Sequence, residues 1–272
     1  MAFALCVAIS CSNDDDTNNN EQQQESGQSF TAEEFATLTP ETLPDYDTWS
    51  VTGDVTMTQT QFETMMSGIE EALGDREITL IFEDETSLDF MVPYTFSDGM
   101  PVTLLLDNFV SLSAPKVTSL DDYTFACCYY IKSFDLPEVT SMGELAFYRC
   151  YSLVSFNMPK VKNLSHFGFL QPASLVIAEF PSVTSIEGEY IFRYATNLII
   201  LKLTSPDEIT IESSLALYQC TNIANCTLYL HHNNSVLATS DKLKNLYDGS
   251  TFGRVIYVND DGDVTDADGN VL

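Results

Sequence analysis

The chain has few basic residues. It holds 11 Lys and Arg against 40 Asp and Glu in 272 residues, which gives a formal net charge of −29 at pH 7. Arg76 is the only basic residue before Lys116. A surface this acidic repels phosphate backbones, so nucleic acids and anionic membrane surfaces are poor candidate partners. The acidity is more typical of a soluble protein outside the cytoplasm than of a specific ligand site.

Sequence patterns for enzyme chemistry are also missing. The three histidines, His166, His231 and His232, form neither an HExxH motif nor a triad, and we expect them to be solvated. His231 and His232 are neighbours that would point to opposite sides of a strand. No CxxC spacing, GxSxG motif, phosphate loop or dinucleotide fingerprint occurs. The sequence therefore predicts no catalytic residue, no cofactor and no metal ligand.

The chain opens on an apolar stretch, MAFALCVAIS, that is too short to span a bilayer as a helix, which needs about 20 residues. It fits the hydrophobic part of a secretion signal. The end of the stretch, Ala8 to Cys11, resembles the lipobox of bacterial lipoproteins, although no basic residue precedes it and Ala8 replaces a larger aliphatic residue. This resemblance implies a signal peptide over residues 1–11 and lipidation of Cys11.

The residues after Cys11 are polar. Ser12 to Asp16 is similar to the acidic signal that sends some lipoproteins to the outer face of the outer membrane. From there to Gln28 no apolar residue occurs, so the segment cannot bury enough surface to order itself. We expect residues 12–29 to be a flexible tether. The protein would then sit at the outer membrane, with the lipid anchor as its only membrane contact.

The abundant feature of the chain is a period of 22 residues. Four prolines keep this interval, as do the valines that follow each by two positions: Pro115, Pro137, Pro159 and Pro181, with Val117, Val139, Val161 and Val183. An apolar triplet recurs in phase: Phe125-Cys128-Ile131, Phe147-Cys150-Leu153, Phe169-Pro172-Leu175, Phe192-Ala195-Leu198 and Leu217-Cys220-Ile223. A fixed period of this length is typical of a solenoid, in which each repeat buries its apolar side against its neighbours.

Each repeat contains one short strand signal. Segments such as Phe134-Asp135-Leu136 alternate apolar and polar residues just before the proline position, which buries two side chains and exposes the one between them. Stacked repeats would set these strands in parallel about 4.8 Å apart. The sequence thus predicts a mainly β solenoid of about five repeats over residues 101–226.

The flanking regions lack the period, and we interpret them as caps that cover the ends of the solenoid. In residues 30–100 one helix is signalled by Thr60 with Glu63 as a capping box and Gly74 just past the end, followed by a strand at Ile78 to Phe82. Its buried face would be Phe62, Met65, Met66, Ile69 and Leu73. This small N-terminal cap is α+β in class.

Residues 227–272 form the predicted C-terminal cap and acidic tail. We expect a strand at Leu228 to Leu230, a short helix from Ser235 to Tyr247 and a closing strand from Arg254 to Val258. In the tail, Asp261, Asp263 and Thr265 alternate as calcium ligands do. However, Asp266 stands where an EF-hand loop needs glycine and no glutamate closes the loop, so hairpin turns are favoured.

Taken together, the repeats have the form L-P-x-V-T-S-φ-x-x-x-A-F-x-x-C-x-x-L-x-S-φ, with the clearest copy from Leu136 to Phe156. This pattern resembles the BspA-like leucine-rich repeat over about residues 101–230. Later repeats depart from it, since Pro172 and Ala195 replace the cysteine and Leu217 replaces the phenylalanine. The resemblance implies a right-handed solenoid in contact with host molecules or other cells, no enzyme activity, and no shared ligand residues.

Two rows of side chains are the candidate binding residues. One row occupies the exposed strand position: Ser113, Asp135, Asn157, Glu179 and Lys202. The other consists of tyrosines near the corners of the repeats: Tyr129, Tyr130, Tyr148 and Tyr151, with Tyr194 and Tyr218 further on. Exposed aromatic rows suit protein or glycan partners, but these tyrosines equally fit a role in covering the corners.

These features favour a monomeric, non-catalytic surface lipoprotein that adheres through protein–protein contacts to host or neighbouring cells. The alternative is a glycan-binding protein that uses the tyrosines, and an enzyme is a third reading that the sequence hardly supports. Cys128 and Cys150 occupy the same point of successive repeats, within disulfide range, but we favour reduced thiols that fill the corner. A Cys220–Cys226 pair is permitted by the compartment and is not predicted.

Overall fold

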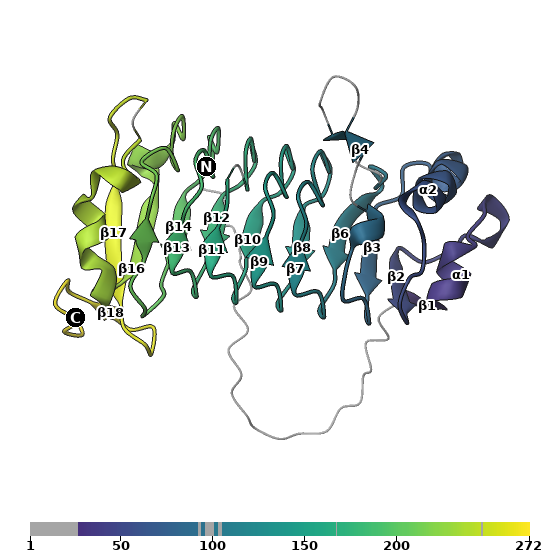
Figure 1. Cartoon of the computed structure of the whole chain (residues 1–272), viewed down its shortest axis with the longest axis horizontal. Coiled ribbons are helices and arrows are strands. Elements are labelled where there is room, and N and C mark those ends of the chain that lie inside the picture. Colours follow the sequence, from purple (N-terminus) through teal and green to yellow (C-terminus); the bar gives the residue numbers. More distant parts are fainter. Residues whose placement is uncertain (1–26, 92–93, 96–100, 103–104, 167, 246) are drawn as a thin grey trace, which may run out of the picture.

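A computed structural model describes residues 27–91, 94–95, 101–102, 105–166, 168–245 and 247–272 of the chain. The expected signal peptide, Cys11 and residues 12–26 of the expected tether lie outside this part. The molecule is a β-rich repeat fold (Figure 1), in which parallel strands stand side by side along an elongated body and two α-helices lie at its N-terminal end. This arrangement agrees with the predicted stacking of parallel strands.

One strand per repeat forms the main row of the fold. Its members in the repeat region are β6 (Phe109–Ser113), β8 (Ser133–Asp135), β10 (Ser155–Asn157), β12 (Ile177–Glu179), β14 (Ile200–Leu203) and β16 (Thr227–His231). β6 pairs in parallel with β8, and β10 to β16 pair in parallel in chain order. Between the two sheets, the Val154 N–H donates to the Lys132 carbonyl oxygen at 3.3 Å. β8, β10, β12, β14 and β16 each begin one residue before the predicted segment.

A second row of two-residue strands forms the return side of the repeats. It contains β7 (Ser119–Leu120), β9 (Ser141–Met142), β11 (Asn163–Leu164), β13 (Ser185–Ile186) and β15 (Thr210–Ile211). β7 pairs in parallel with β9, and β11, β13 and β15 pair in that order. These strands fall on the last two residues of the Val-Thr-Ser-Met type segment, so the return side of the repeats, like the main row, is held by parallel strand pairing.

The core consists of aligned columns of like side chains. The rings of Phe125, Phe147, Phe169 and Phe192 stack along the body with centroid distances of 5.5, 5.2 and 5.6 Å between successive rings. All four rings are buried, as are Val139, Val161 and Val183. Repetition at a period of 22 therefore places equivalent residues one above another, which confirms the packing expected from the sequence.

The corners of the repeats use an unusual backbone conformation. The residue just before the repeating cysteine has a positive φ angle, which is 62° at Cys127 and 59° at Arg149. The Cys127 N–H donates to the Tyr148 carbonyl oxygen at 2.6 Å, and the Arg149 N–H donates to Leu170 at 2.9 Å. Left-handed residues other than glycine are disfavoured by about 1–2 kcal/mol. Hydrogen bonds between successive corners hold them in place.

The N-terminal region extends the same row of parallel strands. β1 (Gly27–Thr31), β2 (Thr48–Thr52) and β3 (Ile78–Phe82) pair in that order, and β3 pairs with β6. β1 begins at Gly27, so the expected tether boundary at residue 29 was too late. Gly27, Gln28 and Ser29 are exposed residues that pair with β2 through their backbone, and a pattern of buried side chains in the sequence does not reveal such pairing.

Two helices and a small hairpin complete this end. α1 spans Ala32–Ala36 and α2 spans Gln59–Leu73, with short 3₁₀ turns at Pro40–Thr42 and Asp89–Met91 and a hairpin of β4 (Tyr94–Thr95) with β5 (Pro101–Val102). All five residues of the predicted helix face are buried. The capping box is Thr58 with Gln61, not Thr60 with Glu63, so the helix begins two residues earlier than expected.

At the C-terminal end β17 (Arg254–Val258) pairs in parallel with β16, at the predicted bounds, and β18 (Val264–Thr265) folds back on it. The predicted helix over 235–247 was wrong. The described chain forms 3₁₀ segments at Ile223–Asn225, His232–Thr239 and Asp241–Leu243 instead. The buried Asn234 side chain donates to the Ser205 and Asp207 carbonyl oxygens at 2.9 Å each, and this anchor kinks the segment.

Candidate binding face

The outward positions of the main strands form one continuous line. We call it the outer row, and its members are Ser113, Asp135, Asn157, Glu179, Lys202 and Tyr229. Within each sheet the strand register places these residues directly opposite one another. The structure therefore brings the predicted candidates together. It adds Tyr229, which the alternation of Leu228, Tyr229 and Leu230 in the sequence already signalled.

Neighbours in the outer row interact through their side chains. The Ser113 hydroxyl donates to Asp135 Oδ2 at 2.9 Å, and Lys202 Nζ forms an ion pair with Glu179 Oε1 at 2.6 Å. The Lys202 ammonium also lies 5.7 Å from the centre of the Tyr229 ring. Asp135 and Asn157 are exposed, and the other members are partly exposed. The row is thus a solvent-facing polar surface whose one cation is neutralised by its neighbour.

Tyrosines and arginines form a second surface along the corners. We call it the tyrosine–arginine ridge, and its members are Tyr129, Tyr148, Arg149, Tyr151, Tyr190, Arg193, Tyr194 and Tyr218. Arg193 lies over three tyrosine rings, with 4.7 Å to the centre of Tyr194. Arg149 lies over Tyr148 at 4.9 Å. The arginines were not among the predicted residues, although they alternate with Gln171 and Gln219 at repeat spacing and donate hydrogen bonds to them.

The four predicted tyrosines do not form a single line. Tyr129 and Tyr151 stack face to face, with centroids 5.4 Å apart and planes 12° apart. Tyr148 is only 9% exposed, and burial raises the pKa of its hydroxyl. Tyr130 is 51% exposed and lies beside Leu105 and Leu106. Stacking covers one face of each ring, so only the outer faces of the pair are left for a sugar to stack on.

The corner cysteines are buried thiols. Cys150 Sγ donates to the Phe125 carbonyl oxygen, and Cys220 Sγ to that of Ala195, both at 3.3 Å. Burial raises the pKa of Cys150 well above its usual value and that of Cys220 and Cys226 to about 12. A thiol at such a site is unreactive at neutral pH. The cysteines therefore fill the corners, as we favoured, and the structure contains no Cys128–Cys150 or Cys220–Cys226 bond.

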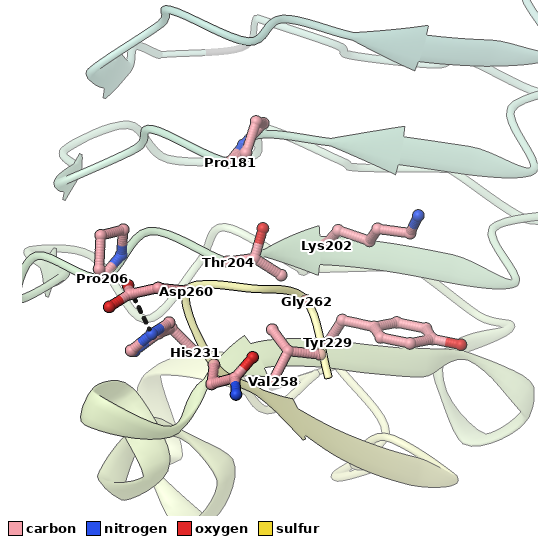
Figure 2. A pocket seen from close by; sticks show the side chains of 10 residues that line it. Pro181, Lys202, Thr204, Pro206, Tyr229, His231, Val258, Asp260 and Gly262 are labelled. Carbon is pink, nitrogen blue, oxygen red and sulfur yellow. Dashed lines mark ion pairs between the residues drawn. The ribbon is translucent and has the colours of Figure 1, made fainter. Parts of the chain in front are cut away.

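The outer row ends in a cavity of about 460 Å³, shown in Figure 2. We call it the end pocket, and its lining residues are Pro181, Lys202, Thr204, Pro206, Tyr229, His231, Val258, Asn259, Asp260 and Gly262. The turn between β17 and β18 supplies Asn259, Asp260 and Gly262, while β14, β16 and the segments after them supply most of the opposite wall. No single stretch of sequence contains this set, so sequence reasoning missed the pocket.

The histidines are not solvated as expected. His231 is 2% exposed, and its ring lies against that of His232 with centroids 4.5 Å apart, because β16 ends there and the chain turns. His231 Nδ1 accepts from the Asn233 N–H at 3.3 Å. Its Nε2 lies 3.3 Å from Asp260 Oδ1 but makes no hydrogen bond. His166 Nδ1 accepts from the Glu189 N–H at 3.0 Å and is partly buried.

The acidic tail forms the two predicted hairpin turns. Asn259 Oδ1 accepts from the Asp261 and Asp263 N–H groups at 3.1 and 2.8 Å. Asp266 Oδ1 accepts from those of Asp268 and Asn270 at 3.0 and 2.9 Å, and hydrogen bonds from Asn270 lower the pKa of Asp266. Within the described residues no cluster of three or more His, Cys, Asp or Glu side chains could hold a metal ion. In the same part of the chain, every helix is too short or too polar to span a bilayer.

Comparison with known proteins gives one match. The family model of the BspA type leucine rich repeat region matches residues 110–245 in six copies, where the sequence analysis expected about five over 101–226. Neither the curated proteins nor the solved structures contain a match. Repeats of this type generally mediate protein–protein interaction, and the family is generally non-catalytic.

Proposed function

The chain belongs to the family of proteins with BspA-type leucine-rich repeats, and on that premise we propose that it is a non-catalytic adhesion protein that binds another protein through its outer row. The repeats would form a right-handed solenoid, since parallel strands joined by a crossover are right-handed in about 98% of cases. Such a scaffold presents an extended surface without large rearrangement.

The observation that carries this proposal is the outer row itself. It places six polar or aromatic side chains on one face, with steps of about 4.8 Å set by strand pairing. Strand pairing fixes the backbone of each member, so binding orders little beyond the side chains themselves. Glu179 is paired with Lys202, so Asp135 leaves the row with one net negative charge, and the formal net charge of −29 on the chain would steer a basic protein surface toward it.

We assign the protein to the outer membrane, exposed at the surface and anchored by a lipid on Cys11. The support is the short apolar start of the chain, the small residue before Cys11 and the acidic residues after it. The proposal predicts that radiolabelled palmitate enters the expressed protein and does not enter a Cys11→Ala variant. Equal labelling of both proteins would refute the lipid anchor at Cys11 and would leave the binding proposal unaffected.

The binding proposal is tested by charge reversal on the outer row. Proteins captured from mucosal extracts by the wild type would be identified, and the affinity of each would be measured for the Asp135→Lys/Asn157→Lys variant. The matched control is Glu63→Lys/Ser67→Lys, which adds the same charge at two exposed positions of α2. A partner that the row binds loses at least about tenfold in affinity with the first variant only. Equal losses with both variants, or none with either, would refute the assignment of this face.

Glycan binding through the tyrosines is the alternative function. Tyr151 is 38% exposed and Arg149, two residues before it, lies over the Tyr148 ring, so the ridge offers an aromatic and cationic surface. Glycan-array binding that is abolished by Tyr129→Ala and by Tyr151→Ala would favour this alternative. The stacking of these two rings on each other makes it the weaker candidate.

A further inference from the structure

The end pocket is large enough for a small molecule. Its volume of about 460 Å³ lies within the range of about 300–1,000 Å³ that is common for ligand pockets. It is also many times larger than the roughly 30 Å³ that one water molecule occupies in the liquid. Figure 2 shows the turn that carries Asp260 and Gly262 passing over the ends of the strands that carry Lys202 and Tyr229. The site is therefore a recess at one end of the outer row.

His231 places a buried hydrogen-bond donor at the inner end of this pocket. Because Nδ1 accepts from the Asn233 N–H, the proton of the neutral ring is on Nε2. That Nε2 is buried and makes no hydrogen bond to any described residue. A buried donor without an acceptor is unfavourable, so the site favours a ligand that brings an oxygen to this position.

The Asp260 carboxylate beside His231 Nε2 limits which classes of ligand fit the pocket. Asp260 Oδ1 lies 3.3 Å from His231 Nε2, which has almost no exposed surface of its own, so a ligand group reaches Nε2 only where the 81% exposed Asp260 side chain turns aside, and it then meets both groups. A hydroxyl can accept from Nε2 and donate to the carboxylate at the same time. A carboxylate would only accept and would be repelled by Asp260, while an ammonium would only donate and would leave Nε2 without an acceptor.

The remaining walls fit a sugar ring. Tyr229 contributes a partly exposed aromatic ring, and Pro181, Pro206 and Val258 add apolar surface against which the C–H groups of a pyranose can pack. Thr204 adds a hydroxyl. The Lys202 ammonium is paired with Glu179 at 2.6 Å, so it offers little net positive charge to an anion. We propose that the end pocket binds a neutral pyranose sugar of one or two rings. This inference does not depend on protein binding by the outer row.

The test uses the full chain and the methyl glycosides of glucose, galactose, mannose and N-acetylglucosamine as probes. Binding is measured by saturation-transfer NMR and by the shift of the His231 Hε1 resonance, one of only three histidine signals in the chain. We expect at least one glycoside to bind with a Kd below about 10 mM. We expect the Asp260→Ala and Tyr229→Leu variants each to bind that glycoside about tenfold or more weakly than the wild type does. The matched control, Asp261→Ala, changes an exposed residue of the same turn and should bind as the wild type does.

Three results would overturn the proposal: no glycoside binds at about 10 mM, Asp260→Ala and Tyr229→Leu leave the affinity unchanged, or only a charged probe binds. The charged probes are methyl glucuronide and N-acetyl-lysine amide. Thermal melts of each variant confirm that it is folded. Sugar binding by the Asp135→Lys/Asn157→Lys variant separates the two proposals, because those residues lie outside the pocket. That variant should lose its protein partner and keep the sugar.

Discussion

Removing one ring from the phenylalanine column should destabilise the protein strongly. Phe147 is fully buried, with Phe125 and Phe169 stacked on either side at 5.5 and 5.2 Å and the Phe156 ring 4.6 Å away. Phe147→Ala removes a ring that touches three repeats, and the corner backbone is held by hydrogen bonds that resist collapse. We expect a loss of about 3–5 kcal/mol in the free energy of unfolding.

The assay is denaturant unfolding followed by circular dichroism, with thermal melting as a second measure. For a protein of this size the loss corresponds to a fall in Tm of about 6–20 °C. Ile199→Ala is the control, because Ile199 is a large aliphatic residue that is 47% exposed, and it should change stability by less than about 1 kcal/mol. If Phe147→Ala and Ile199→Ala are equally mild, the column does not carry the packing assigned to it.

Four further predictions concern other parts of the fold. The pKa of Cys220 is raised from 9.0 to about 12, so its thiol contributes stability that is complete below about pH 9 and is lost as pH rises toward 12. The Tm of the wild type should therefore fall more between pH 8 and 10.5 than that of Cys220→Ala, and parallel curves would contradict this. Gly143→Ala should destabilise the fold, because a Cβ there would lie 2.4 Å from the Asp122 nitrogen. Gly68 lies in α2, and a Cβ there would meet nothing within 4 Å, so Gly68→Ala should stabilise the protein by about 0.5–1 kcal/mol. A denaturant midpoint that rises for Gly143→Ala, or falls for Gly68→Ala, would refute the packing around that glycine. Asn234→Ala should lower the unfolding free energy by about 2–4 kcal/mol, since its amide serves Ile209, Ser205 and Asp207, and a midpoint within error of the wild type would show that these bonds are dispensable.

The repeat region was predictable because its signal is local and repeated. Pro137, Val139 and Phe147 recur at the interval that also separates the strands, so one period gives both the columns and the strand register. The outer row followed from the same alternation. The C-terminal strand Arg254–Val258 was predictable as a short β-rich run bounded by polar turns.

The N-terminal strands were harder to place in the sheet. β2 and β3 are separated by α2, and β3 and β6 by a further insertion, so no fixed interval links their paired residues. We expected a cap there, and the cap continues the row of strands. The burial of His231 and the end pocket depend on a turn at Asp260 that returns over an earlier strand. Such contacts between distant segments leave no periodic trace in the sequence.

The central claim is that one residue of each repeat lies on a straight outer row, and spin-label distances test it directly. Labels at Ser113 and Lys202 are four strand steps apart, and labels at Ser50 and Lys202 are six steps apart. At about 4.8 Å a step, the two separations should be about 19 and 29 Å before the label linkers are added. A difference of about 10 Å between the two distributions is the expected result. Equal distances, or a shorter one for the Ser50 pair, would contradict the stacked row and the binding face that depends on it.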